Sequence, residues 1–207
     1  MIKNIVFDIG NVILNFNCKE VLNKYTNNID DQEFIMKNII NSPEWLEHGL
    51  IDTGYVTRKD AIKIVQDRTN HEKDDLIEDF WNNYNDYSNI NSDMLELLKN
   101  IKNKGYNIYL LSNINSYTYN HIKKSGLFEI VDGYVLSYIE HQIKPYISIY
   151  NTLINRYKLN PKECLFIDDN INNIDTSNKI GMIGKKVIPD NYDSVVSVLK
   201  ELSVLGD

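Results

Sequence analysis

The sequence is poor in cysteine, with two residues of this type, Cys18 and Cys164, in a chain of 207. The two lie far apart in unrelated contexts and show no metal-ligand spacing, so the sequence predicts no cysteine-based metal site. We expect both thiols to be reduced, in a cytoplasmic protein.

Long apolar runs and basic clusters are also missing. No stretch is long enough to cross a membrane, and the apolar start, which Asp8 interrupts, is too short for a signal peptide. Lysine and arginine form no run and the formal net charge is -7, which argues against a nucleic-acid surface. An acidic protein can still bind an anionic substrate if a metal ion or a placed lysine supplies positive charge. We therefore expect neither nucleic acid nor a membrane as a partner.

The composition that remains is that of an ordinary globular protein. Hydrophobic residues make up 43% of the chain and charged residues 25%. The length is sufficient for one sizeable core, or for one core with a small accessory lobe. No internal repeat or low-complexity tract is visible.

A short apolar run near the start of the chain predicts the first strand. Ile5, Val6 and Phe7 are β-branched or aromatic, which is typical of a strand buried on both faces. Asp8 follows directly, and Gly10 then indicates a turn. In an open parallel sheet the ligand crevice lies at the carboxyl ends of the strands, so Asp8 is expected there. Taken alone, Asp8 is equally compatible with a simple turn cap.

The stretch from about residue 17 to residue 85 shows helical periodicity and no convincing strand. Pro43 begins a short segment that we expect to end at Gly49, and Thr57 is a plausible N-cap of the next helix. These helices are too many for a single crossover connection. They predict a helical lobe inserted after the first strand, with its aromatic residues in its own core.

From Ser92 onwards the pattern changes to an alternation of helices and strands. Ser92 is expected to cap a helix that Gly105 ends in the left-handed conformation. Four more strands are predicted at 106–111, 134–136, 165–167 and 183–188. Helices are predicted at about 116–126 and 147–157, at 194–202, and in a segment that closes near Gly181. The alternation predicts an α/β fold, a doubly wound parallel sheet with a small inserted α-helical cap. The predicted domains are a core of residues 1–16 and 86–207 and a cap of residues 17–85.

Polar residues follow several of the predicted strands. They are Asp8, Ser112 with Asn113, and Asp168 with Asp169, while Lys144 stands in the loop after another strand. Each of these alone is as well explained by a helix cap or a solvated loop. Right-handed crossovers, however, bring the strand ends to one edge of the sheet. Together they offer what phosphoryl transfer needs: clustered carboxylates for a magnesium ion, hydroxyl and amide groups for phosphate oxygens, and a lysine for the transferring charge.

Four segments in this order, FDIGNV, LLSN, IKP and FIDDNINNI, resemble the four motifs of the haloacid dehalogenase-like (HAD) hydrolases. The resemblance covers essentially the whole chain, and the helical insert resembles the first type of cap in that superfamily. Within it, the FD-x-GNV variant and the chain length are most similar to bacterial α-glucose-1-phosphate phosphatases.

The resemblance implies a role for each matching residue. Asp8 would be the nucleophile that forms an aspartyl-phosphate, and Lys144 would bridge it to the phosphate. Mg²⁺ would be the cofactor, held by Asp8, the Gly10 carbonyl and Asp169, with Asp168 as a ligand or a neighbouring carboxylate. The implied phosphate-binding residues are Ser112, Asn113, Asn11 and Lys144. Asn173 stands where the superfamily often has a group that orients the lysine.

Two positions depart from the superfamily pattern. The usual D-x-D motif ends in a second aspartate that acts as general acid and base, whereas this chain has Gly10 there. Loss of such a catalyst costs on the order of a hundredfold in rate, unless a cap residue or water replaces it or the leaving group is good, as in an anomeric sugar phosphate. The second departure is His141, where the superfamily commonly has glycine before the Lys-Pro loop. We expect His141 to be structural or solvated.

Three functions fit these residues. The first is a magnesium-dependent phosphatase of a small phosphorylated metabolite, acting as a monomer or homodimer. The second is a 2-haloacid dehalogenase, which also uses an aspartate nucleophile but needs no metal, so the Asp168 and Asp169 pair argues against it. The third is a weakly active binding or regulatory protein of the same fold. Trp45, Glu47 and His48 are candidate cap residues that face the site, although a place on the cap surface or in its core explains them equally well.

Overall fold

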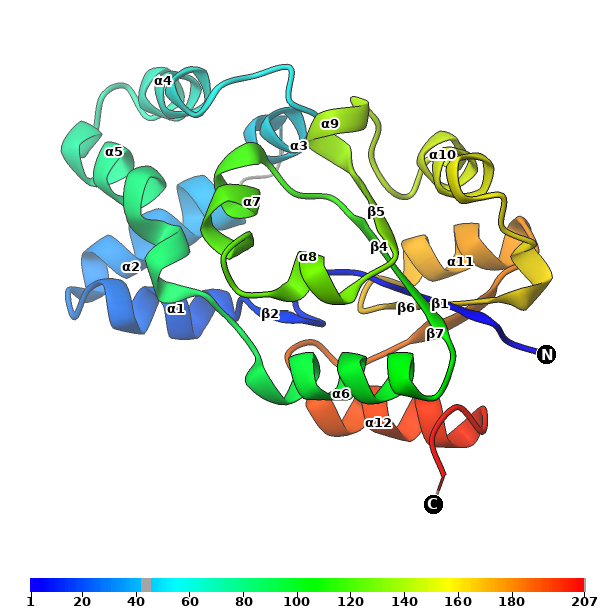
Figure 1. Ribbon diagram of the computed structural model, residues 1–207. Coiled ribbons are helices and arrows are strands. Elements are labelled where there is room, and N and C mark those ends of the chain that lie inside the picture. Colours follow the sequence, from blue (N-terminus) through cyan, green and yellow to red (C-terminus); the bar gives the residue numbers. More distant parts are fainter. Residues whose placement is uncertain (42–45, 207) are drawn as a thin grey trace.

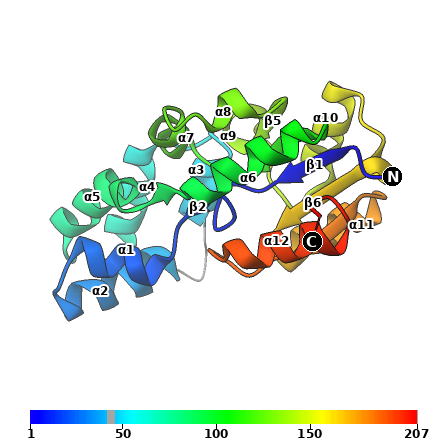
Figure 2. The ribbon, with the colours of Figure 1, turned by 60° about the horizontal axis from the view of Figure 1, so that its bottom comes forward.

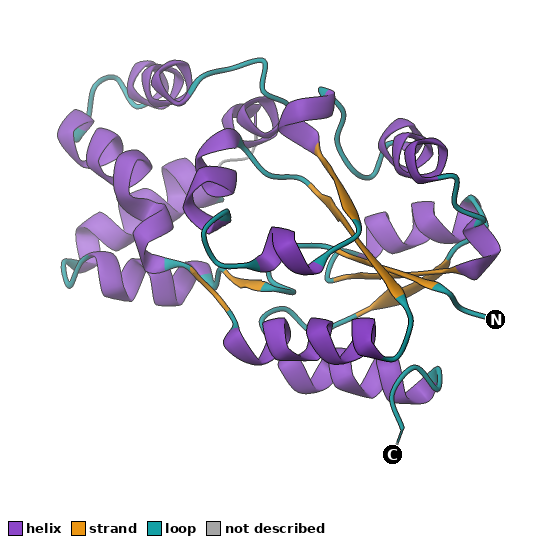
Figure 3. Ribbon diagram, viewed as in Figure 1, coloured by secondary structure: helices purple, strands orange, loops and turns teal. Residues whose placement is uncertain are grey.

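A computed structural model describes residues 1–41 and 46–206 and shows a parallel five-stranded sheet with helices on both faces (Figure 1, Figure 3). In chain order, the strands of this sheet are β1 (Asn4–Phe7), β4 (Asn107–Ser112), β5 (Gly133–Leu136), β6 (Cys164–Asp168) and β7 (Ile183–Lys186). They are arranged in the order β5-β4-β1-β6-β7. This confirms the predicted α/β fold with a doubly wound parallel sheet.

The strands are apolar on both faces because helices cover both faces. Ile5 and Phe7 of β1 belong to one apolar cluster, which also contains residues of α6 (Ser92–Asn103) and α12 (Tyr192–Glu201). Val6 points the other way, into a cluster with α10 (Ile147–Tyr157) and α11 (Ile171–Lys179). Figures 1 and 2 both show α6 and α12 side by side on one face of the sheet. Burial on both sides explains why the strand sequences lack a polar alternation.

The order of the strands reverses at β1. From β1 the chain continues to β4 and β5 on one side of the sheet, and then crosses to β6 and β7 on the other. In β1 and β6, Phe7 lies beside Ile167, so that the next residues, Asp8 and Asp168, are neighbours. A reversal of this kind opens a crevice at the carboxyl ends of the central strands, which is where such sheets bind ligands.

The helices between residues 17 and 88 pack on one another beside the sheet (Figure 2). They are α1 (Cys18–Tyr25), α2 (Ile29–Ile35), a π-helical turn (Met36–Ile40), α3 (Leu46–Asp52), α4 (Arg58–Arg68), α5 (Asp74–Asn83) and a 3-10 turn (Tyr84–Tyr87). Their apolar cluster is built around fully buried residues such as Trp81. Thr57 caps α4 as predicted, in a capping box with Asp60. The expected end at Gly49 is wrong, because α3 continues through this glycine to Asp52.

Two short strands that the sequence analysis missed join the insert to the sheet domain. β2 (Leu14–Asn15) and β3 (Asn89–Ile90) pair antiparallel, so the outgoing and returning chains are hydrogen-bonded to each other. Two residues are too few for an alternating pattern to be recognised. The division into a core of residues 1–16 and 86–207 and a cap of residues 17–85 stays a prediction.

Several predicted boundaries need correction. Asn91, and not Ser92, caps α6, because its side chain accepts the backbone N–H groups of Asp93 and Met94. The helix predicted at 116–126 ends earlier, because α7 spans Ser116–Ile122. Gly126, in the left-handed conformation, precedes a further short helix, α8 (Leu127–Ile130), that the sequence analysis missed. Gly105 does end α6 with a positive φ of 91°. The last strand ends at residue 186, because the chain turns toward α12, which begins at residue 192. No helix among the described residues has the length and apolar character needed to span a bilayer.

Packing of α11 against β7 requires a glycine at position 184. A Cβ atom there would clash with the Ser177 hydroxyl and would approach the Ile174 carbonyl oxygen to 3.0 Å. We therefore expect Gly184→Ala to lower the free energy of unfolding by about 1–3 kcal/mol. Gly49→Ala is the matched control, because the new Cβ meets nothing within 4 Å inside α3. This substitution should raise the free energy of unfolding by up to about 1 kcal/mol. Urea unfolding of both variants measures the two changes, and equal shifts would contradict this account of the contact.

Candidate active site

Three aspartates meet at the carboxyl edge of the sheet. Asp8 follows the last residue of β1, Asp168 ends β6, and Asp169 comes next in the chain. One carboxylate oxygen from each lies within 4.8 Å of the others. The register of β1 against β6 explains the juxtaposition, because Asp8 continues β1 at the level of Asp168. The sequence predicted this grouping.

Lys144 lies between two of these carboxylates. Its Nζ is 2.9 Å from Asp8 Oδ1 and 2.6 Å from Asp168 Oδ2, and its side chain is 1% exposed. Lys144 comes from the loop after α9 (Ser137–Glu140), and Asn113 fixes that loop from β4. The Asn113 amide accepts the backbone N–H of Lys144 at 2.8 Å and donates to its carbonyl at 2.9 Å. Asn113 thus positions the lysine through its backbone.

The two oxygens of the Asp8 carboxylate differ in their surroundings. Oδ1 accepts hydrogen bonds from the Ser112 hydroxyl and from the Ile9 backbone N–H, each at 2.7 Å, in addition to the contact with Lys144. Among residues 1–41 and 46–206, no group donates a hydrogen bond to Oδ2. Three donors therefore fix the carboxylate through one oxygen and leave the other for a ligand or a reaction.

Asp168 is surrounded by donors. Asn173 donates its amide N–H groups to both carboxylate oxygens at 3.0 Å, and the backbone N–H of Asn170 donates at 2.7 Å. With Lys144 as a further partner, this fully buried carboxylate is engaged on both oxygens. Its geometry suits a residue that holds the lysine better than one that faces a ligand. Tyr150, which the sequence analysis did not single out, supports this part of the site by donating to the Asn173 carbonyl at 3.0 Å.

Asp169 is half-buried and makes its hydrogen bond with the turn after β1. Asn11, in a left-handed conformation with φ 56°, donates to Asp169 Oδ2 at 3.1 Å. Gly10, just before it, does not have a positive φ, and a Cβ atom at this position would meet nothing within 4 Å. The backbone therefore accepts a side chain at the position where the superfamily motif has its second aspartate. The residues predicted for the site from the strand ends and from the Lys144 loop all lie in this region, and their chemical roles stay predictions.

The charges of the site influence one another strongly. Burial raises the pKa of Asp8 from 3.8 to about 7, with nearby Lys144 lowering it and Asp168 raising it again. Burial alone would lower the pKa of Lys144, but the carboxylates of Asp168 and Asp8 outweigh it, so the net shift is upward and the lysine stays charged. Burial also raises the pKa of Asp169, against the hydrogen bond from Asn11. One lysine does not offset three carboxylates, so the site disfavours full ionisation unless a cation joins it.

His141 has a structural contact outside the carboxylate cluster, as predicted. It lies three residues before Lys144, in a left-handed conformation with φ 55°. Its Nδ1 is 2.7 Å from the Thr53 carbonyl oxygen, and its ring stacks on Tyr55 with centroids 4.8 Å apart. Because a carbonyl only accepts, Nδ1 carries the proton. His141 therefore connects the Lys144 loop to the segment that follows α3.

Sequence reasoning missed Asp52, the last residue of α3. Its Oδ1 accepts a hydrogen bond of 3.1 Å from the amide of Asn115, three residues after Ser112. Burial raises the pKa of Asp52 to about 7. Asp52 was not considered for the site because the segment that contains it was expected to end at Gly49. Of the cap residues predicted to face the site, Trp45 lies outside the described residues, and the side chains of Glu47 and His48 are likewise not among those described.

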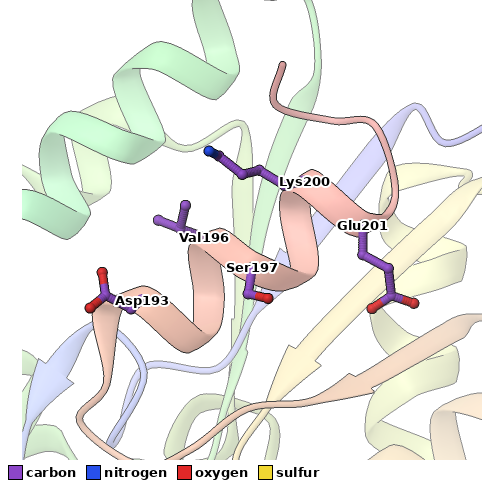
Figure 4. Close-up of a pocket in the computed structure, with 5 residues that line it drawn as sticks. All are labelled: Asp193, Val196, Ser197, Lys200 and Glu201. Atoms are coloured by element: carbon purple, nitrogen blue, oxygen red, sulfur yellow. The ribbon is translucent and has the colours of Figure 1, made fainter. Parts of the chain in front are cut away.

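A surface hollow of about 500 Å³ lies elsewhere, along α12 (Figure 4). Its lining residues are Asp193, Val196, Ser197, Lys200 and Glu201, all from this one helix. It shares no residue with the carboxylate cluster, and nothing in the hollow resembles a catalytic arrangement.

Comparison with known proteins places these features in a family. A model of the haloacid dehalogenase-like hydrolases matches residues 2–181, which is most of the chain. Among curated proteins, a sesquiterpene phosphatase of Aspergillus oryzae is 25% identical over 92 residues, which are 44% of this chain and 47% of that protein. The chain therefore spans less than half the length of this relative.

Solved structures share the fold over nearly the whole chain. A HAD family enzyme of Bacteroides thetaiotaomicron, in complex with magnesium and inorganic phosphate, has a TM-score of 0.75 at 21% identity and covers 95% of this chain and 99% of its own. A predicted HAD-like hydrolase of Porphyromonas gingivalis has a TM-score of 0.75 at 22% identity, covering 100% of both chains. The L-2-haloacid dehalogenase of Xanthobacter autotrophicus has a TM-score of 0.68 at 14% identity, covering 100% of this chain and 85% of its own.

The upward pKa shift of Asp8 gives a test of the electrostatics without any substrate. A carboxyl whose pKa rises on folding contributes stability below its unfolded pKa, and this contribution is lost as the pH rises from about 4 through about 7. Asp8→Asn removes the carboxyl while keeping its shape. In the presence of chelator, the variant should therefore become more stable than the wild type as the pH rises, by roughly 1–4 kcal/mol at pH 8 and by little at pH 4. Chemical denaturation across this pH range measures the difference, and a variant less stable than the wild type at pH 8 would contradict the assignment.

Proposed function

The chain belongs to the haloacid dehalogenase-like hydrolase family, and from this premise we propose that it is a Mg²⁺-dependent phosphatase of a small phosphorylated metabolite. The reaction passes through an aspartyl-phosphate on Asp8, and a sugar phosphate is a suitable substrate. One observation carries the proposal: Asp8 belongs to a cluster of three carboxylates, its Oδ1 contacts one buried lysine, and its Oδ2 accepts no hydrogen bond from the described residues.

The donor set of this cluster fits a hard divalent cation. Three carboxylates with a single lysine leave an excess of negative charge in a mostly buried place, and carboxylate and carbonyl oxygens are the ligands that Mg²⁺ prefers. Asp8, Asp169 and the Gly10 carbonyl would hold the ion, whereas Asp168 is occupied by Lys144 and Asn173. When bound, the ion supplies positive charge against the phosphoryl oxygens.

Side chains of the protein itself carry the other catalytic roles. Asp8 Oδ2 attacks phosphorus, a P–O bond forms to the aspartate, and the leaving group departs as an alkoxide with the electron pair of the broken P–O bond and takes its proton from solvent. Lys144, held between Asp8 and Asp168, stabilises the negative charge that spreads over the phosphoryl group. Ser112 fixes the attacking carboxylate by donating to its Oδ1, and Ser112 and Asn113 are the proposed binding residues for the phosphate oxygens. Water then attacks the phosphorus of the aspartyl-phosphate and restores the Asp8 carboxylate.

The relatives support this choice of reaction. One curated relative is a phosphatase, and a structural neighbour contains magnesium and inorganic phosphate. Dehalogenation is the second candidate, since dehalogenases share the fold and the absence of an acid at Gly10 suits a reaction that protonates no leaving group. The excess of carboxylates favours the phosphatase, because a halide displacement needs no cation.

The decisive experiment is the turnover of p-nitrophenyl phosphate with and without Mg²⁺. The wild type should hydrolyse it in Mg²⁺ and fall to background in excess chelator, and Asp8→Asn should show no turnover, because the nucleophile is gone. Asp169→Asn should raise the Mg²⁺ concentration for half-maximal activity about tenfold or more. Asp175→Asn, which removes an exposed carboxylate of α11, is the matched control and should behave as the wild type. Full activity in chelator, or dehalogenation of 2-haloacids instead, would refute the phosphatase.

Gly10 generates a second prediction, since its backbone accepts a side chain. Gly10→Asp places a proton donor where the superfamily motif has one, and should raise kcat/KM by about tenfold or more on esters of weakly acidic alcohols. The gain should be small on p-nitrophenyl phosphate, whose leaving group needs no proton. Gly10→Asn adds the same volume without an acid, so it separates proton transfer from shape. Equal rates for the two variants across a series of alkyl and aryl phosphates would show that no acid is missing.

A further inference from the structure

The end of α3 is attached to the two loops that carry the candidate catalytic groups. The Asn115 amide, on the loop after β4, donates to Asp52, and His141, on the loop after α9, donates to the Thr53 carbonyl. The next residue, Gly54, packs so closely on α9 that a Cβ atom there would lie 2.6 Å from the Tyr138 carbonyl oxygen. Consecutive residues of the insert are thus fixed at the carboxyl edge of the sheet. Asp52 is the acidic one among them.

A buried network holds the carboxyl of Asp52 in place. Asn115, 5% exposed, caps α7 with its side-chain oxygen, which accepts the backbone N–H groups of Tyr117 and Thr118. Its amide nitrogen donates to Asp52 Oδ1 and to the Tyr84 hydroxyl. Every polar atom of the Asn115 side chain is therefore engaged, which leaves the amide little freedom to turn away. The position of Asp52 Oδ1 is set by the core, although Asp52 itself belongs to the insert.

The folded chain does not explain why a carboxyl stands here. Within the part of the chain that the structure describes, Asp52 makes this one hydrogen bond and no ion pair, and its Oδ2 has no partner. Burial raises the pKa of Asp52 to about 7, the only upward shift among the described carboxylates of residues 17–85. Asp52 is partly exposed, and its Oδ2 is not a fully enclosed atom, so a ligand can reach this oxygen. A partly buried carboxyl with a raised pKa and a free oxygen is typical of sites that bind a ligand.

We propose that Asp52 determines substrate specificity: its free oxygen binds a hydroxyl group on the leaving alcohol, so the preferred substrates are phosphate esters of polyols and sugars. This rests on the proposed phosphatase function. Gly10 offers the leaving alcohol no side chain, and the end of α3 is attached to the same edge of the sheet. A hydroxyl group can donate a hydrogen bond to the ionised carboxylate or accept one from the protonated carboxyl, so it suits both states of Asp52. A hydrocarbon in the same place would leave the carboxyl desolvated and unpaired, and polar sites reject such analogues strongly.

Matched pairs of esters test this assignment. myo-Inositol 1-phosphate and cyclohexyl phosphate are six-membered carbocyclic esters of secondary alcohols that differ in hydroxyl groups, and glucose 6-phosphate and cyclohexylmethyl phosphate are a comparable primary pair. In at least one pair, the wild type should prefer the hydroxylated ester by about ten- to hundredfold in kcat/KM, the effect of one hydrogen bond to a carboxylate. Asp52→Leu should bring this ratio close to one. Glu78→Leu removes an exposed carboxylate from α5 of the same insert and should keep the wild-type ratio.

Asp52→Asn is a second variant in case the leucine disturbs the fold. Its amide oxygen keeps the hydrogen bond from Asn115, while its NH₂ group replaces the free oxygen. The kcat/KM ratio of hydroxylated to cyclohexyl ester should therefore fall by less than in Asp52→Leu. A preference of the wild type for the cyclohexyl esters, or a ratio unchanged in both Asp52 variants, overturns the proposal. An equal loss on both members of a pair also overturns it, since Asp52 would then act on folding or on the chemical step. If the wild type hydrolyses no ester, p-nitrophenyl phosphate included, the phosphatase function itself fails, whereas turnover with unaltered ratios rejects only the role of Asp52.

Discussion

The buried contact of Lys144 with Asp8 and Asp168 is the interaction on which the rest of the site depends. Three charged groups leave water here, and each loses solvation that only its neighbours replace. The pairing is sustained by further hydrogen bonds. Asn113 holds the backbone of Lys144, and Asn173 holds both oxygens of Asp168. Loops that follow three different strands are thereby tied to one point, which gives the carboxyl edge of the sheet a defined geometry.

The same contact leaves an imbalance of charge. Lys144 neutralises at most one carboxylate, while Asp8 and Asp169 are both shifted toward protonation by burial. The fold therefore keeps a destabilising excess of negative charge at one place, which has no structural benefit of its own. Sites that bind a cation or carry out a reaction commonly retain such strain, because the ligand or the transition state relieves it. Asp8, whose Oδ2 accepts no hydrogen bond from the described residues, is one of the three carboxylates that make up this excess.

The sequence predicted the sheet and its edge because these follow from local patterns. Apolar strands that end in polar residues, in a regular alternation with helices, have few alternatives to a parallel sheet with the polar ends at one edge. Lys144 was placed at this edge because its loop follows a predicted strand, whereas its bridging role beside Asp8 came only from the family resemblance, since nothing local shows that a lysine after α9 turns inward. The two-residue strands β2 and β3 are too short to produce a pattern. Asp52 was out of reach for another reason, because its contact with Asn115 joins residues 63 positions apart in sequence. Contacts of this kind depend on how the insert packs on the sheet.

The two departures from the superfamily pattern, His141 and Gly10, differ in what the backbone requires at each position. At position 141 the backbone is left-handed, a conformation in which glycine is free of strain and a histidine costs on the order of 1 kcal/mol. The histidine ring offsets this cost through its hydrogen bond to Thr53 and its stacking on Tyr55, contacts that a glycine cannot make. These contacts fix the segment after α3 against the Lys144 loop, next to Asp52. Gly10, in contrast, has no side chain, although the backbone at this position would accept one. One departure thus leaves space beside the turn that follows Asp8, and the other attaches the segment after α3 to the loop that carries Lys144.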